Sequence, residues 1–126
     1  IVSKNMIKKK NGKIINISSI FGLVSREKRS SYSSSKFGIL GLTKSSALDL
    51  ASYNILVNSI SPGFIDTKLT RNILKLSGMK KMSKVVPVKR LGKVKEIAYL
   101  SMFLASSYNT YITGQNIVID GGFTSK

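Results

Sequence analysis

Three short runs of apolar, mostly β-branched residues occur along the chain, at 13–18, 54–60 and 116–120. Each run is nearly continuous in apolar residues rather than alternating with polar ones, and each ends at Ser, Pro or Gly. Continuous hydrophobicity is typical of strands that are covered on both faces, as in a parallel sheet. The pattern therefore predicts three buried strands.

Between these runs, apolar residues recur with the spacing of an amphipathic helix, at 32–51 and at 94–106. Ser30 or Ser31 is a suitable N-cap for the first of these helices. The segment 67–76 is also predicted to be helical, and Ser77-Gly78 is predicted to end it.

Strand and helix thus alternate, and the predicted strands lie too far apart in sequence for hairpins but suit right-handed crossovers. We expect an α/β fold of the doubly wound, Rossmann-like kind within one domain. Three strands make a thin sheet, so one outer face and one long edge would be left bare.

The 126 residues include no Cys and no His. Disulfides, thiolate metal sites and histidine-based triads are therefore excluded, and no metal site is expected. Acid–base chemistry would have to use Tyr, Lys, Asp or Glu. No apolar stretch approaches the roughly 20 residues of a membrane span.

The formal net charge is +16, from 21 basic and 5 acidic residues. Such an excess allows an anionic lipid, an acidic protein or a nucleic acid as partner. The charges are scattered, however, and no aromatic-rich nucleic-acid motif accompanies them. The abundance of Lys, Ile, Asn and Ser favours compositional drift, so we expect no nucleic-acid partner.

One Tyr-x-x-x-Lys sequence, Tyr32 to Lys36, opens the first predicted helix. Residues i and i+4 share a helix face, so the ammonium would favour tyrosinate and make the phenol a usable proton donor and acceptor. Ser19 follows the first predicted strand by one residue, and ligands of open α/β sheets bind at the carboxyl ends of strands. The three side chains are therefore candidates for one catalytic site.

The second predicted strand runs into Pro62-Gly63, which predicts a tight turn that lets the backbone approach a ligand. Taken with the other motifs, this turn completes a pattern that resembles the short-chain dehydrogenase/reductase family. The matching stretches occur in family order and cover nearly the whole chain: GKIINISSIFG (12–22), SYSSSKFGILGLTKSSALDLA (31–51), ILVNSISPGFIDTKLT (55–70), RLGKVKEIAYLSMFLAS (90–106) and YITGQNIVIDGGF (111–123).

The resemblance implies roles for individual residues. Tyr32 would donate a proton to a substrate carbonyl as hydride arrives from nicotinamide, and Ser19 would hydrogen-bond that carbonyl. Lys36 would hold the nicotinamide ribose and assist Tyr32. Tyr32, Lys36 and four residues around the turn would contact the cofactor, NADP or NAD; these four are Pro62, Gly63, Ile65 and Thr67.

The branch that the chain resembles most is 3-oxoacyl-[acyl-carrier-protein] reductase of fatty acid biosynthesis, which would favour NADPH and an acyl-carrier-linked substrate. The alternative is a reductase of a sugar or another small carbonyl in surface polysaccharide biosynthesis. The family implies a homotetramer or homodimer when full length. We expect a cytoplasmic location, with a plastid-type organelle as the alternative.

Residues 1–126 would then be a partial domain, the catalytic half of the family's fold. The Gly-rich loop that receives the pyrophosphate in the family's N-terminal half is absent from this sequence. A truncated, inactive fragment is therefore a further alternative, and we expect the isolated chain to aggregate or to need a partner. The loop 25–29 carries more charge than is usual beside the catalytic serine.

Overall fold

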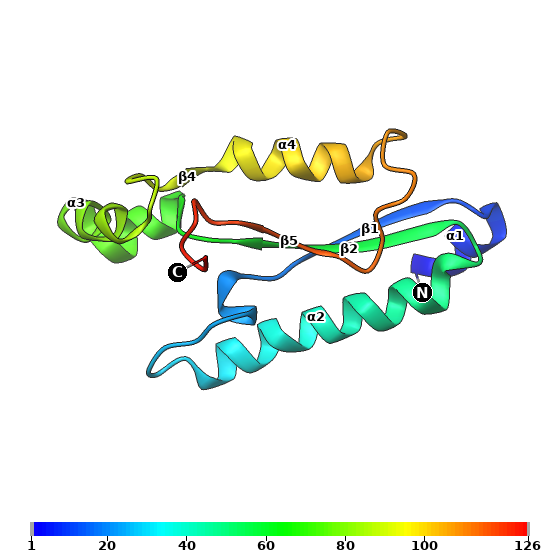
Figure 1. The fold of residues 1–126 in the computed structure, drawn as a ribbon, viewed down its shortest axis with the longest axis horizontal. Coiled ribbons are helices and arrows are strands. Elements are labelled where there is room, and N and C mark those ends of the chain that lie inside the picture. Colours follow the sequence, from blue (N-terminus) through cyan, green and yellow to red (C-terminus); the bar gives the residue numbers. More distant parts are fainter. Residues whose placement is uncertain (1, 126) are drawn as a thin grey trace.

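A computed structural model describes residues 2–125 and shows a three-stranded parallel sheet at the centre of the molecule (Figure 1). Its strands are β1 (Gly12–Ile17), β2 (Ile55–Pro62) and β5 (Asn116–Ile119), in the spatial order β1-β2-β5. Each predicted strand is present, with its ends shifted by at most two residues. The doubly wound α/β class is confirmed.

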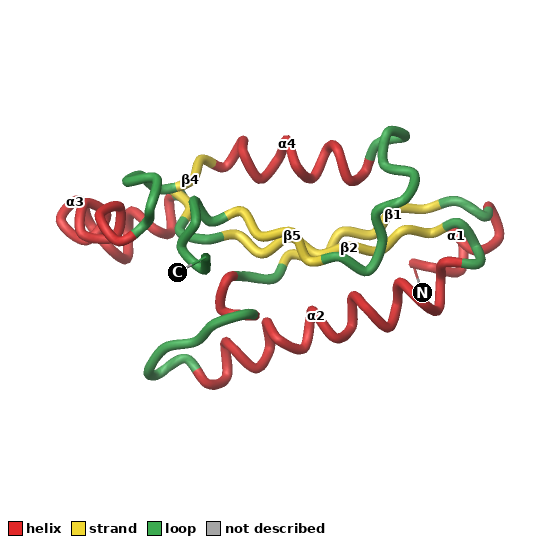
Figure 2. Tube along the Cα trace, viewed as in Figure 1, coloured by secondary structure: helices red, strands yellow, loops and turns green. Residues whose placement is uncertain are grey.

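Helices cover both faces of this sheet (Figure 2). Helix α2 (Ser30–Ala51) lies along one face with α1 (Val2–Lys9) near its C-terminal end, and α4 (Val94–Ala105) lies along the other. The expected bare outer face is therefore covered. None of the helices in the described part of the chain is long and apolar enough to span a membrane.

Strand β2 is the core of the molecule because it is paired on both sides and covered on both faces. Ile55, Val57 and Ile60 on this strand are fully buried. Ala47 of α2 joins Ile55 and Val57 in a cluster against which α1 packs. Burial of each such side chain stabilises the folded protein by about 1.5–3 kcal/mol. Strand β2 is therefore the element on which the rest of the sheet is anchored.

The buried polar residues of β2 hold the loop that leads into β5. The Asn58 side chain donates to the carbonyl of Ile112 at 2.7 Å and accepts from the backbone N–H of Gln115 at 3.0 Å. The hydroxyls of Ser59 and Ser61 both donate to the side-chain oxygen of Asn116, at 2.9 and 2.7 Å. These bonds fix β5 beside β2 in its register.

A second, two-stranded sheet lies beyond the end of β2, and the sequence pattern did not predict it. It pairs β3 (Ile65–Asp66) with β4 (Gly92–Lys93). Strands of two residues carry no hydrophobic period from which they could be recognised.

The predicted helix 67–76 is longer than expected, because α3 spans Lys68–Val85. Its N-cap is Thr67, whose hydroxyl oxygen accepts from the Thr70 N–H at 3.1 Å. The prediction that Ser77-Gly78 ends the helix is wrong. The helical geometry is interrupted earlier, at Lys75, whose φ of 52° and ψ of 179° lie outside the helical region.

The predicted cap of α2 is also wrong. Ser30 and Ser31 both lie inside its first turn, and the N-cap position belongs to Arg29, which makes no side-chain cap bond. Instead the Arg29 carbonyl accepts from the backbone N–H of Ser33 at 2.7 Å. The helix begins two residues before Tyr32 because a 3-10 turn and loop, rather than a serine cap, direct the chain into it.

Strand β1 is an edge strand among the residues described, as the sequence led us to expect. The helices that flank the sheet also expose large apolar side chains on their outer faces, among them Leu42, Leu48, Tyr99 and Met102. Surfaces of this kind favour association with another chain segment, so aggregation of the isolated chain stays a prediction.

Candidate active site

The carboxyl end of β1 leads directly into the first candidate residue. The Ser18 N–H donates to the Ile60 carbonyl at 2.8 Å, which extends the ladder between β1 and β2 by one bond. Ser19 then turns the chain into a short 3-10 helix, η1 (Ile20–Gly22), and its oxygen accepts from the Phe21 N–H at 3.2 Å. This bond uses the serine oxygen as an acceptor, so the hydroxyl proton remains free to be donated.

Helix α2 brings Tyr32 and Lys36 to the same strand end. The Lys36 ammonium donates to the Ile17 carbonyl, the last of β1, at 3.1 Å. The same nitrogen lies 5.7 Å from the centroid of the Tyr32 ring. Lys36 therefore connects the tyrosine to the strand that carries Ser19, and its ammonium keeps two more protons to donate.

Two further contacts fix this part of α2 against the end of β1. The buried hydroxyl of Ser18 donates to the backbone carbonyl of Lys36 at 2.9 Å. The hydroxyls of Ser25 and Ser33 share a hydrogen bond of 2.7 Å. Since α2 is joined here through its own first two turns, Tyr32 and Lys36 cannot move independently of the strand end.

Four aromatic rings from distant parts of the chain meet beside these residues. The Phe21 ring contacts the Tyr32 ring edge-on, with centroids 6.1 Å apart, and the Phe64 ring at 6.4 Å. Phe64 in turn contacts Phe123 at 5.1 Å, also edge-on. We call these four residues the aromatic row. The sequence motifs gave no signal for it, because its members are isolated in sequence and only the sheet topology brings them together.

Pro62 and Gly63 lie at the same edge of the sheet, two residues beyond the Ile60 carbonyl that Ser18 binds. Pro62 is the last residue of β2 and the chain bends at Phe64, so the predicted tight turn at Pro62-Gly63 is not formed. The Gly63 N–H donates to the Ile119 carbonyl at 3.0 Å. A Cβ at position 63 would lie 2.7 Å from the Asp120 Cα, so this glycine is needed for the close packing of the chain after β2 against the end of β5.

Ile65 and Thr67, the other two predicted cofactor contacts, follow the bend at Phe64. Ile65 is half-buried in β3, and the Thr67 hydroxyl is already engaged as the N-cap of α3. Pro62, Gly63 and Thr67 therefore each have a local structural role. These roles leave room for a further contact with a ligand.

The donor set at the strand end fits the nicotinamide ribose of a dinucleotide. The Lys36 ammonium has protons beyond the one given to Ile17, and a vicinal diol accepts hydrogen bonds from such a group. Lys36 and the 62–67 segment would hold the nicotinamide end. Among residues 2–125, no group of three or more acidic, His or Cys side chains could hold a metal ion.

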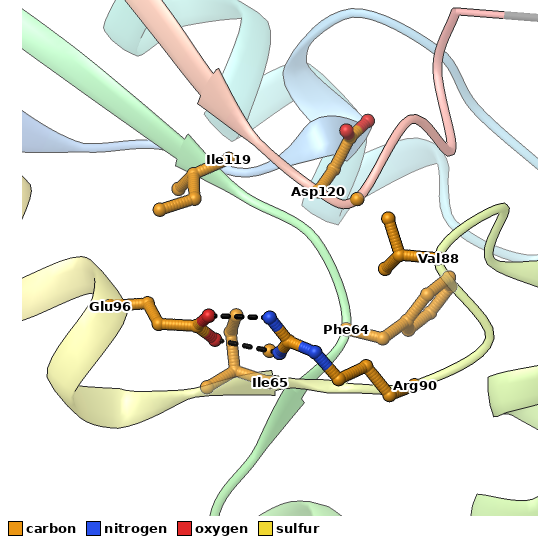
Figure 3. A pocket seen from close by; sticks show the side chains of 9 residues that line it. Phe64, Ile65, Val88, Arg90, Glu96, Ile119 and Asp120 are labelled. Carbon is orange, nitrogen blue, oxygen red and sulfur yellow. Dashed lines mark hydrogen bonds and ion pairs between the residues drawn. The ribbon is translucent and has the colours of Figure 1, made fainter.

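A cavity of about 220 Å³ lies at the carboxyl ends of β2 and β5, separate from the Ser19–Tyr32–Lys36 cluster (Figure 3). Its walls include Phe64, Ile65 and Asp120. The Arg90 and Glu96 side chains face one another across one side of it, joined by bonds of 2.6 and 2.9 Å.

The environment of this pair stabilises the carboxylate. The hydrogen bond from Arg90 and the backbone N–H of Lys93 lower the pKa of Glu96 from 4.5 to about 2. Glu96 stands in the first turn of α4, so the pair fixes the start of that helix against β4. The Arg90–Glu96 pair therefore has a structural role.

The chain is similar to known proteins over nearly its whole length. The sequence matches the family described as enoyl-(acyl carrier protein) reductase over residues 2–124. It is 43% identical over 117 residues to the 3-oxoacyl-[acyl-carrier-protein] reductase FabG of Thermotoga maritima, an alignment that covers 93% of this chain and 47% of the relative.

Solved structures match equally well. ElxO with NADP bound superposes on 99% of this chain with a TM-score of 0.93 at 35% identity, over 51% of its own length. A gluconate 5-dehydrogenase from Burkholderia cenocepacia, in complex with NADP and tartrate, gives a TM-score of 0.92 at 34% identity over 99% of this chain and 49% of its own. The chain thus spans about half the length of the proteins that it matches.

Proposed function

Because this chain belongs to the short-chain dehydrogenase/reductase family, we propose that it carries the catalytic side chains of a nicotinamide-dependent carbonyl reductase. Ser19, Tyr32 and Lys36 are the proposed catalytic residues, and Lys36 with the 62–67 segment would hold the nicotinamide end of NADP or NAD. The bound nicotinamide would supply the hydride for reduction of the substrate carbonyl.

The residues of this chain would do the remaining work. The Ser19 hydroxyl would keep its proton and donate a hydrogen bond to the substrate carbonyl oxygen, which holds that oxygen in place. The Tyr32 phenol would donate its proton to the same oxygen as negative charge develops there. The Lys36 ammonium, beside the Tyr32 ring, would stabilise the tyrosinate left behind.

The observation that supports this mechanism best is the double contact of Lys36. Its ammonium binds the last carbonyl of β1 at 3.1 Å while it lies 5.7 Å from the Tyr32 ring. A lysine with only a solvent role at the helix surface would extend into water instead. This double contact supports a site formed by Ser19, Tyr32 and Lys36 at the end of β1.

We propose a 3-oxoacyl thioester carried by an acyl carrier protein as the substrate, on the basis of the 43% identity to the Thermotoga reductase. A small oxo acid or oxo sugar acid is the second candidate substrate, because a gluconate 5-dehydrogenase has nearly the same backbone over this chain. The family's Gly-rich pyrophosphate loop is not among these 126 residues, so turnover would require a segment that supplies it.

The test is an assay of NADPH and NADH oxidation with purified protein, given acetoacetyl-acyl carrier protein or a 5-oxo sugar acid. Oxidation that depends on the thioester would support the first substrate, and oxidation that depends on the sugar acid would support the second. A protein joined to a functional Gly-rich half that binds the cofactor but reduces neither carbonyl would contradict the proposal.

A further inference from the structure

The loop that joins η1 to α2 is unusually cationic, and its residues are exposed. Within residues 25–29 it carries Arg26, Lys28 and Arg29 against a single acid, Glu27. The loop begins four residues after Phe21 and ends three residues before Tyr32, so it borders the proposed catalytic cluster.

Arg26 has a fixed position within this loop. Its guanidinium carbon lies 5.5 Å from the centroid of the Phe21 ring. Phe21 is also the ring that contacts Tyr32, at 6.1 Å. The Phe21 ring therefore contacts both the guanidinium and the ring of the tyrosine that is proposed to donate the proton.

This contact engages the guanidinium through the ring face and leaves its N–H groups available. Within residues 2–125, the arginines that form salt bridges are Arg71 with Asp66 and Arg90 with Glu96. Arg26 forms none with any described carboxylate. Its charge is therefore positioned beside the site without being neutralised.

The loop is also anchored next to Arg26. The preceding residue, Ser25, is bonded to Ser33 of α2 at 2.7 Å, and the Val24 N–H donates to the Ile20 carbonyl at 3.0 Å. Because the backbone is fixed on the N-terminal side of Arg26, the guanidinium is presented from a preorganised position.

We infer that Arg26 forms an anion-binding subsite beside the Phe21–Tyr32 ring pair, and that the substrate carries a carboxylate or phosphate that this guanidinium binds. The inference rests on the proposed reductase function and deepens it by naming the substrate class. A planar guanidinium binds either oxyanion with two parallel N–H bonds, which an exposed lysine cannot do. The anion has two sources: the carboxylate of a small oxo acid, or the phosphate of a phosphopantetheine arm.

Binding can be tested apart from catalysis. In protein with ¹⁵N-labelled arginine, the Arg26 side-chain N–H signal is identified by its loss in Arg26→Lys and followed during titration. Two matched pairs of compounds distinguish the sources: acetoacetate against its methyl ester, and acetoacetyl-phosphopantetheine against acetoacetyl-pantetheine. The signal should shift with the anionic member of one pair and not with its neutral partner.

A shift with acetoacetate assigns the carboxylate, and a shift confined to phosphopantetheine assigns the phosphate. Equal shifts with charged and neutral members, or none with any of them, would overturn the subsite. A selective shift, in protein joined to a functional Gly-rich half that binds the cofactor but reduces no carbonyl, would refute the reductase proposal and leave the anion site supported.

Kinetics give the second measurement. For the anionic member of the pair that shifts the signal, Arg26→Gln should reduce the ratio of kcat/KM, anionic over neutral, about tenfold or more, because a charge-assisted pair is lost. Arg29→Gln is the matched control, since it removes an equal charge from the same loop, and should leave that ratio unchanged. Equal losses in both variants would show that only the overall charge matters and would refute the assignment to Arg26.

Discussion

The Ser18 hydroxyl donates to the backbone carbonyl of Lys36 at 2.9 Å, across eighteen residues of sequence. Ser18 is buried, and it directly precedes Ser19. One hydrogen bond thus joins the strand end that carries the serine to the helical turn that carries the lysine. The geometry of the proposed catalytic cluster depends on this junction as much as on the three side chains themselves.

Gly22 is the residue whose substitution should disturb this junction most directly. A Cβ there would lie 2.7 Å from the Ser18 hydroxyl oxygen and 2.8 Å from the Lys36 carbonyl oxygen, so the backbone would have to shift. We expect Gly22→Ala to destabilise the protein by about 1–3 kcal/mol, as overpacking does. Denaturant unfolding measures this loss.

Gly38 provides the matched control, because it lies within α2 and a Cβ added there would meet no other part of the chain within 4 Å. Gly38→Ala should stabilise the protein by roughly 0.5–1 kcal/mol through helix propensity. Equal effects at the two positions would show that the contact at Gly22 is not as close as described.

Tyr32→Phe removes the proposed proton donor and keeps the ring that contacts Phe21. Carbonyl reduction should fall by about 10²–10⁴-fold in kcat, the usual contribution of a general acid, with cofactor affinity retained. Steady-state kinetics and a cofactor-binding titration measure the two quantities. Tyr111→Phe, at a side chain that is 95% exposed, is the control. Full activity in Tyr32→Phe would refute the assigned role.

The Arg90–Glu96 pair should make stability depend on acid pH. Glu96 has its pKa lowered from 4.5 to about 2 in the folded protein, chiefly by the Arg90 hydrogen bond, so its contribution is complete above pH 4.5. That contribution is lost as the pH falls through this window, because the unfolded state then binds the proton more readily. Denaturation midpoints measured across this window should fall less steeply in Glu96→Gln than in the wild type.

Glu27→Gln serves as the control for this experiment, because Glu27 forms no salt bridge within the described chain. It should retain the pH dependence of the wild type. The same slope in all three proteins would mean that the Arg90–Glu96 pair does not contribute to acid stability.

Replacing the Asn58 amide with a carboxylate should destabilise the folded protein. Its side chain is 1% exposed, and its amide group donates to the Ile112 carbonyl. Asn58→Asp would set an acceptor against that carbonyl in a dry site, so we expect a loss of at least about 1–3 kcal/mol. Asn72→Asp, at an exposed position on α3, should change the unfolding free energy little; a comparable loss there would contradict the burial argument.

The hydrophobic runs predicted the three strands of the sheet and the class of the fold because burial on both faces leaves a continuous apolar pattern. The Tyr32–Lys36 spacing predicted two side chains on one face of α2, and Lys36 does contact both the Tyr32 ring and the last carbonyl of β1, since helix periodicity is a local rule. That Ser19 joins them in one site stays a prediction. The roles of these residues in catalysis remain proposals.

What the sequence could not predict depends on tertiary contacts. The kink at Lys75 has no Gly or Pro to mark it, and the start of α2 is set by a carbonyl of Arg29 rather than by a capping serine. The contact of Arg26 with Phe21 links residues only five apart, yet it requires the particular turn of η1. Contacts of this kind depend on how the elements pack against one another, which local sequence patterns do not specify.

The aromatic row has a mechanical consequence. Phe123 lies in the turn after β5. The Asp120 carboxylate stabilises this turn, because it accepts hydrogen bonds from the N–H of Gly122 and from the N–H and hydroxyl of Thr124. From there, edge contacts pass through Phe64 and Phe21 to the Tyr32 ring. Removing or tagging that turn should therefore change the position of the Tyr32 ring through these side-chain contacts alone.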